Sequence, residues 1–211
     1  MGKIEFNSIR KEFVSGRLDE SDIPENPFYL FGKWMKKAIS EIDENANSMV
    51  LSTLSAEGKP SSRIVLLKDF NKNGLTFFTN YNSRKGDDLN SNANASLLFY
   101  WKEFHRQIRI EGKVEKVKEE VSDRYFDSRP ENSRISAMIS PQSKIIPDRI
   151  FLENKYKEAK DSANITRPAN WGGYILKPAY FEFWQGREGR MHDRICFNKE
   201  KGLWDVFRLA P

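Results

Sequence analysis

The sequence lacks the features that mark disulfide-rich, membrane-spanning and zinc-binding proteins. Cys196 is the only cysteine, so no disulfide can form within the chain, and a small buried side chain is the simplest role for it. No apolar run approaches the ~20 residues that span a bilayer. With two histidines and one cysteine a zinc cluster is nearly excluded, and no metal site is predicted. These absences favour a reduced, cytoplasmic setting.

Several nucleotide-binding and catalytic signatures are also missing. The chain contains no G-x-G-x-x-G turn, no G-x-x-x-x-G-K-[ST] loop and no G-x-S-x-G elbow. The formal net charge is +5, but basic residues do not form the continuous block that is typical of a nucleic-acid-binding arm. The excess of positive charge therefore favours small phosphate ligands. A nucleic-acid binder remains open from the charge alone.

The pattern of apolar residues predicts a mainly β chain with flanking helices, an α+β protein of one domain over residues 1–211. In the first helix, Phe31, Met35, Ala38 and Ile39 recur at helical spacing and are expected to pack in the core. Many short strands separated by turns predict an antiparallel sheet closed into a barrel. Helices are expected at 26–45, 83–92, 119–128, 133–139 and 147–160, and strands at 48–55, 61–68, 75–79, 95–101, 106–117, 171–177, 180–185, 192–198 and 204–209.

Basic residues stand at the ends of several predicted elements. Arg63 and Lys68 bracket one strand, where they could contact different parts of a long ligand. Ser83, Arg84 and Lys85 begin a short helix, with Ser83 as its cap. Backbone N–H groups, a hydroxyl and two cations at a helix start would suit a phosphate, although a capped helix with exposed charges is the simpler alternative.

The segment 182–194 is unusual because it places a tryptophan, a histidine and three arginines around two glycines. Flat stacking, cation donation and close backbone approach are all available within this stretch. In a strand, Arg190 and His192 would lie on the same face. We therefore expect the cluster, more than any single residue in it, to have a function.

In this segment the sequence resembles the pyridoxine/pyridoxamine 5′-phosphate oxidases. The blocks that carry the resemblance are Trp171-Gly172-Gly173-Tyr174, Glu182-Phe183-Trp184-Gln185-Gly186, Arg190-Met191-His192-Asp193-Arg194 and Arg208-Leu209-Ala210-Pro211. It continues upstream through Arg63 to Lys68, Phe78-Thr79-Asn80, Ser83-Arg84-Lys85, Arg106-Gln107, Tyr125 to Pro130 and Gln142-Ser143, and covers nearly the whole chain from Arg10.

The resemblance implies an FMN-binding split β-barrel that acts as a homodimer, with flavin at the subunit interface and residues 1–25 as an amino-terminal lid or arm. The FMN contacts it implies are Arg63, Lys68, Phe78, Thr79, Arg84, Lys85, Gln107, Gln142, Ser143, Trp184 and Arg194. The substrate contacts it implies are Arg10, Phe13, Lys68, Tyr125, Arg129, Ser133, Arg190 and His192, with Arg190 and His192 as the catalytic pair.

These assignments are chemically reasonable. Arg84 and Lys85 suit the FMN phosphate. Tyr125, Arg129 and Ser133 form a second phosphate cradle if they share a helix face, although Pro130 makes a turn an alternative. Phe13 and Phe78 stand where many family members carry tyrosine, and each lacks a hydroxyl.

The resemblance implies oxidation of pyridoxine or pyridoxamine 5′-phosphate to pyridoxal 5′-phosphate. Hydride would pass to the flavin, and O₂ would reoxidise it to give hydrogen peroxide. Small molecules, not nucleic acid or membrane, are the expected partners. Two alternatives remain open: a split-barrel flavin reductase with another substrate, and a non-catalytic module that binds flavin or pyridoxal phosphate.

Overall fold

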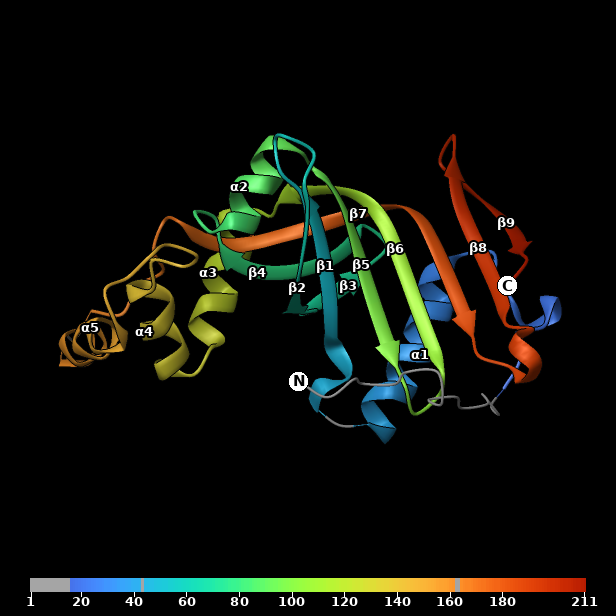
Figure 1. Ribbon diagram of the computed structural model, residues 1–211, viewed down its shortest axis with the longest axis horizontal. Helices are drawn as coiled ribbons and strands as arrows, with labels where there is room; N and C mark the ends of the chain where they lie inside the picture. The colour runs from blue at the N-terminus through green and yellow to red at the C-terminus, as the bar shows by residue number, and fades with distance from the viewer. Residues whose placement is uncertain (1–15, 43, 162–163) are drawn as a thin grey trace, which may run out of the picture. The chain divides into compact units, whose positions relative to one another are not determined.

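The computed structural model of the chain, drawn in Figure 1, describes residues 16–42, 44–161 and 164–211. Clustering of contacts along the chain divides it into two compact units. Unit 1 comprises Met1–Ala46, Leu98–Ile110 and Tyr180–Pro211, and unit 2 comprises Asn47–Leu97 and Glu111–Ala179. The expectation of a single domain over residues 1–211 stays a prediction. Most of the expected lid, including Arg10 and Phe13, lies outside the described residues.

The described elements are mainly strands. The helices are α1 Pro27–Glu41, α2 Arg84–Ser91, α3 Glu119–Ser128, α4 Glu131–Ile139 and α5 Arg149–Asp161, with short 3-10 turns at Glu20–Asp22, Glu44–Asn47 and Glu188–Arg190. The strands are β1 Ser48–Leu54, β2 Pro60–Leu66, β3 Asp69–Asn71, β4 Gly74–Asn80, β5 Asn94–Trp101, β6 Arg106–Lys116, β7 Trp171–Gln185, β8 Asp193–Glu200 and β9 Leu203–Leu209.

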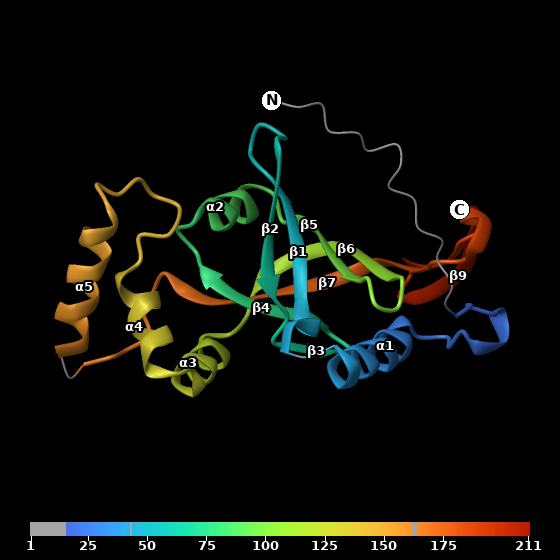
Figure 2. The same ribbon diagram turned by 60° about the horizontal axis from the view of Figure 1, so that its bottom comes forward.

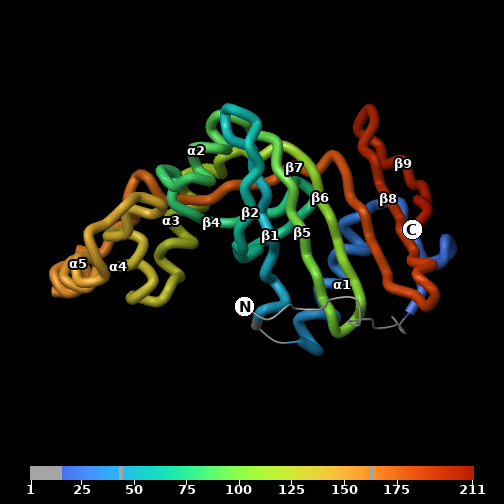
Figure 3. Tube along the Cα trace, in the orientation of Figure 1, coloured from blue at the N-terminus to red at the C-terminus, as the bar shows by residue number. Residues whose placement is uncertain are grey.

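The strands form one sheet in the order β2-β1-β5-β6-β7-β4-β3, with β8 paired to β7 and β9 to β8. The pairings β1–β2, β3–β4, β4–β7, β7–β8 and β8–β9 are all antiparallel. Figure 3 shows β8 and β9 as a hairpin at the carboxyl end of the chain. The expected antiparallel, mainly β class is therefore confirmed.

In unit 1, helix α1 covers aromatic residues of the strands. The Asn26 side chain caps it by accepting a hydrogen bond from the Phe28 N–H at 3.0 Å, as expected of Asn before Pro. Phe31 and Trp34 are buried against strand aromatics in edge-to-face contacts. Ile39 was expected in the core but is 59% exposed, because it lies about 100° around the helix from buried Ala38.

Strand β7, whose residues 171–179 belong to unit 2 and residues 180–185 to unit 1, is longer than expected. Two strands, 171–177 and 180–185, were predicted on either side of Pro178, but the chain runs through Pro178 as one strand. Residues 171–176 pair with β4 and residues 180–185 pair with β8, so Pro178 falls between these two ladders, where its missing N–H is tolerated. Elsewhere in unit 2, α4 and α5 lie side by side (Figure 2).

No helix in the described ranges combines the length and hydropathy needed to cross a bilayer. Likewise, no group of three or more metal-ligating side chains occurs among the residues that the structure describes.

Candidate functional site

Unit 2 contains a cavity of about 450 Å³ that gathers many of the predicted site residues. Eight of them line it: Lys68, Phe78, Thr79, Lys85, Tyr125, Arg129, Ser133 and Gln142. The other lining residues are Ile64, Val65, Leu66, Pro130 and Trp171. The volume lies in the range of small-molecule and cofactor sites.

One side of the cavity is built at the break between α3 and α4. Tyr125 belongs to α3 and Ser133 to α4, and Arg129, in extended conformation, links the two helices together with Pro130. The single helix face that the spacing suggested is therefore wrong, because proline disfavours helical geometry at the residue before it. The turn that was the alternative brings all three polar residues to the same cavity.

Aromatic rings form the wall beside Arg129. Phe78 stacks on Tyr125 with ring centres 3.9 Å apart, and the Tyr125 and Trp171 rings are nearly parallel. The Arg129 guanidinium lies over the Trp171 ring at 4.7 Å. Trp171 was noted only as part of a sequence block, and nothing in its local pattern indicated that it lines the site.

Arg129 is incompletely satisfied in the described part of the chain. Its Nη1 atom is buried and has no hydrogen-bond partner there. Burial lowers the pKa of its guanidinium. A buried donor without a partner is costly, so this atom is suited to an anionic group that enters the cavity.

Lys85 is a second buried cation on the cavity wall, with only 9% of its surface exposed. It donates to the Ser83 hydroxyl at 3.1 Å and to Gln142 Oε1 at 2.8 Å, and Thr79 donates to the same oxygen. These partners of Lys85 are neutral. Burial, and then the nearby charge of Arg63, lower the pKa of Lys85 to about 8.

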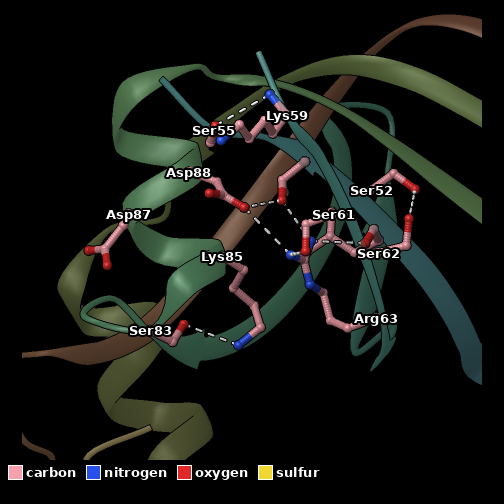
Figure 4. A network of polar contacts seen from close by, with 12 residues as sticks. Ser52, Ser55, Lys59, Ser61, Ser62, Arg63, Ser83, Lys85, Asp87 and Asp88 are labelled. Carbon is pink, nitrogen blue, oxygen red and sulfur yellow. Dashed lines mark hydrogen bonds and ion pairs between the residues drawn. The ribbon is translucent and has the colours of Figure 1, made fainter. Parts of the chain in front are cut away.

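Three of the predicted FMN contacts that belong to unit 2 do not line this cavity. The Arg63 guanidinium, shown in Figure 4, contacts Asp88 and neighbouring oxygens. Arg84 is exposed at the start of α2, and Ser143 takes a positive φ of 68°. Lys68 does line the cavity but follows β2, which ends two residues earlier than the expected strand.

The other predicted contacts, Gln107, Trp184, Arg190, His192 and Arg194, belong to unit 1. The Trp184 and His192 rings lie 4.6 Å apart, and His192 Nδ1 accepts a hydrogen bond from the Arg187 N–H at 3.1 Å. Arg194 pairs with buried Glu182 at 2.8 Å.

Arg190 and His192 do not share a strand face as expected. Arg190 ends a 3-10 turn with a φ of 60°, and β8 begins only at Asp193. The preceding Gly189 also has a positive φ, of 62°, so the backbone turns at this point instead of extending.

Two family models match this chain. The model described as "Pyridoxamine 5'-phosphate oxidase" matches residues 35–163. The model described as "Pyridoxine 5'-phosphate oxidase C-terminal dimerisation region" matches residues 171–211.

Curated proteins with the same family name match nearly the whole chain. A pyridoxine/pyridoxamine 5′-phosphate oxidase of Hydrogenovibrio crunogenus is 46% identical, with 98% of each chain covered. One of Cupriavidus pinatubonensis is 48% identical over 96% of this chain and 97% of its own length.

The crystal structure of PhzG from Burkholderia lata, in complex with tetrahydrophenazine-1-carboxylic acid, superposes with a TM-score of 0.88 at 28% identity, covering 93% of this chain and 99% of the other. This similarity confirms the split-barrel fold that the resemblance implied. The chain belongs to the pyridoxine/pyridoxamine 5′-phosphate oxidase family of oxidoreductases.

Proposed function

We propose that the chain is an FMN-dependent enzyme that oxidises pyridoxine 5′-phosphate or pyridoxamine 5′-phosphate to pyridoxal 5′-phosphate. The observation that carries the proposal is the cavity in unit 2, where an aromatic wall accompanies buried Lys85 and Arg129, whose Nη1 has no partner among the described residues. A flat ligand with an anionic group suits this combination, and the reaction requires two such ligands, the flavin and the substrate.

The side chains around Lys85 fit the phosphate of FMN. Arg63 and Arg84 act on one another electrostatically, as do Arg63 and Lys85, and Asp88 is the carboxylate paired with Arg63. Three cations and one carboxylate leave an excess of two positive charges. A phosphate monoester carries about −1.5 to −2 at neutral pH, so its charge matches this excess.

In this proposal Thr79 and Gln142 support the same phosphate, and Lys68, Phe78, Gln107, Ser143, Trp184 and Arg194 complete the FMN contacts. When bound, FMN would accept a hydride from the substrate's 4′ carbon. O₂ would then reoxidise the flavin and be reduced to hydrogen peroxide.

Arg129 is proposed to bind the substrate's 5′-phosphate together with Tyr125 and Ser133. The phosphate would give the Nη1 atom of Arg129 the partner that it lacks within residues 16–42, 44–161 and 164–211, and the phenol and hydroxyl would donate to the remaining phosphate oxygens. Because Arg129 is partly desolvated, its bond to phosphate is stronger than an exposed contact would be.

Arg190 and His192 are proposed to act on the pyridine ring of the substrate. Arg190 supplies a permanent cation that stabilises negative charge as the alcohol or amine is activated. His192 exchanges a hydrogen bond with the ring oxygen. Nδ1 of His192 accepts a hydrogen bond from the Arg187 N–H.

We further propose that the protein acts as a homodimer. The dimerisation-region model matches residues 171–211, which include the carboxyl-terminal hairpin. On β9, Leu203 is 76% exposed, and Val206 and Phe207 also keep much of their surface accessible. An apolar strand with one neighbour in the sheet is the kind of surface that a second copy covers.

The decisive experiment adds pyridoxine 5′-phosphate to the FMN-loaded protein without oxygen. Loss of the oxidised flavin absorbance, followed by its return and peroxide formation when oxygen is admitted, is the expected result. Binding without any change in the flavin spectrum would instead indicate a non-catalytic module. Reduction by another reductant alone would indicate a flavin reductase.

A further inference from the structure

Arg63 is held by a set of acceptors from three elements of unit 2 (Figure 4). Its Nη1 donates to the Leu51 carbonyl at 3.1 Å and to the Thr53 hydroxyl at 2.7 Å. Its Nη2 donates to the Ser61 hydroxyl at 2.9 Å and lies 3.5 Å from Asp88 Oδ2. These contacts use both terminal nitrogens of the guanidinium.

Asp88 is the least expected member of this set. It comes from α2, is only 5% exposed, and accepts a hydrogen bond from the Thr53 hydroxyl at 2.6 Å. Burying a carboxylate is costly unless cations and donors compensate it. Thr53 donates to Asp88 and accepts from Arg63, so the hydroxyl joins the two charged groups.

A carboxylate here is also unfavourable for the ligand that the site is proposed to bind. Asp88 would repel a phosphate held by Arg63 and Lys85. Its presence therefore requires a compensating benefit. Arg63 lies among like charges, because Arg84 and Lys85 both interact with it unfavourably. Asp88 offsets this repulsion and fixes the orientation of the guanidinium.

We infer that Asp88, through Thr53, is a positioning residue that holds Arg63 ready for the phosphate of FMN. With both terminal nitrogens engaged, the Nε–H group, which makes no hydrogen bond in the described part of the chain, is the donor left for the phosphate. This inference rests on the proposed function. It adds that specific binding of the phosphate depends on a buried carboxylate whose own charge repels that phosphate.

The two possible effects of Asp88 have opposite signs, which makes the inference testable. If Asp88 acts only through its charge, Asp88→Asn removes a repulsion and FMN binds more tightly. If Asp88 positions Arg63, the same substitution weakens FMN binding. Asp87→Asn is the matched control, because Asp87 is the adjacent residue of α2, is exposed and pairs with Lys144 on the surface.

The experiment titrates the flavin-free, full-length chain with FMN and with riboflavin, which lacks the phosphate, and follows flavin fluorescence. Asp88→Asn is expected to weaken FMN binding on the order of ten-fold, about 1.4 kcal/mol. Riboflavin binding should be unchanged, since the effect passes through the phosphate. Asp87→Asn should leave FMN binding unchanged or slightly tighter.

A double substitution tests whether Asp88 acts through Arg63. Arg63→Ala alone should weaken FMN but not riboflavin binding, and Asp88→Asn should cause no further weakening in that background. Equal weakening of FMN and riboflavin by Asp88→Asn, or tighter FMN binding, overturns the inference while the proposed function stands. If Arg63→Ala and Lys85→Ala both leave FMN binding intact, the proposed phosphate site itself fails, and the inference fails with it.

Asp88→Asn could prevent folding because it disturbs a buried network. Thr53→Val then serves as the second variant, since it keeps the side-chain shape and removes the hydroxyl that joins Asp88 to Arg63. The expected result is again a loss of FMN affinity with riboflavin affinity unchanged. Unchanged affinity for both flavins would overturn the inference.

Discussion

The guanidinium of Arg129 lies over the ring of Trp171, 4.7 Å from its centre. Both residues line the cavity in unit 2, and Trp171 is also nearly parallel to Tyr125. Arg129 therefore has one face fixed by an aromatic ring while its Nη1 atom lacks a hydrogen-bond partner in the described chain. This pairing explains how a long, flexible side chain can be oriented before its ligand arrives.

Replacing Arg129 should mainly impair substrate binding. Arg129→Ala removes the charged partner proposed for the 5′-phosphate, at a cost of roughly 1.5–3 kcal/mol, and should raise KM much more than it lowers kcat. Steady-state kinetics with pyridoxine 5′-phosphate measures both constants. Arg124→Ala is the control, because Arg124 is an exposed arginine on α3, the helix that precedes Arg129, and its kinetics should match the parent protein. Equal KM values for the two variants would contradict the assignment.

Trp171 should also affect substrate binding, because its ring holds the Arg129 guanidinium. Trp171→Leu removes a cation–π contact worth about 0.5–2 kcal/mol and should raise KM for the phosphorylated substrate. Trp171→Phe keeps an aromatic ring, so its KM should lie between the KM of Trp171→Leu and that of the parent. Combining Trp171→Leu with Arg129→Ala should raise KM no further than Arg129→Ala alone. Full additivity of the two changes would show that Trp171 acts independently of Arg129.

The sequence alone could predict the residue types of the cavity but not all of its geometry. Ser83 before a short polar helix is a local signal, and Ser83 does cap α2. Asp87 and Asp88 are indistinguishable in sequence, and only packing of α2 on β1 buries the second of them. In the same way, β7 continues through Pro178 because it pairs with distant strands such as β4. These features depend on contacts between distant segments, which local propensity does not contain.

The pH dependence of FMN binding should report the ionisation of Lys85. Its pKa is lowered to about 8, first by burial and then by Arg63. A bound phosphate stabilises the ammonium form, so the contribution of Lys85 is present below about pH 8 and is lost as the pH rises through that value. The FMN dissociation constant should therefore increase above this pH, while that of riboflavin should not. Lys85→Met should abolish the increase, and its persistence would assign the titration to another group.

Substitution of Arg190 or His192 should slow the reduction of the flavin by the substrate without weakening FMN binding. Arg190→Ala and His192→Ala should keep FMN but reduce it slowly in anaerobic single turnover with pyridoxine 5′-phosphate. Arg194→Ala should instead lose flavin affinity. It also leaves buried Glu182 with one arginine, Arg109, so its thermal stability should fall. Flavin reduction at the parent rate in both of the first two variants would move the catalytic assignment to Lys68 and the amino-terminal segment.

The last prediction concerns the proposed homodimer and the placement of the site between two chains. Arg84 belongs to unit 2 and Arg190 to unit 1, and the proposal uses one for the FMN phosphate and the other for the substrate ring. If each site draws these residues from different chains, a mixed dimer of Arg84→Ala and Arg190→Ala contains one site with both arginines intact. Mixing the two inactive variants under conditions that exchange subunits should then recover up to about a quarter of the parent activity, because half of the dimers are mixed and each has one complete site. Mixing Arg84→Ala with an Arg84→Ala/Arg190→Ala double variant is the control and should recover nothing. Absence of recovery, with subunit exchange verified by mass, would mean that each chain supplies both arginines to its own site.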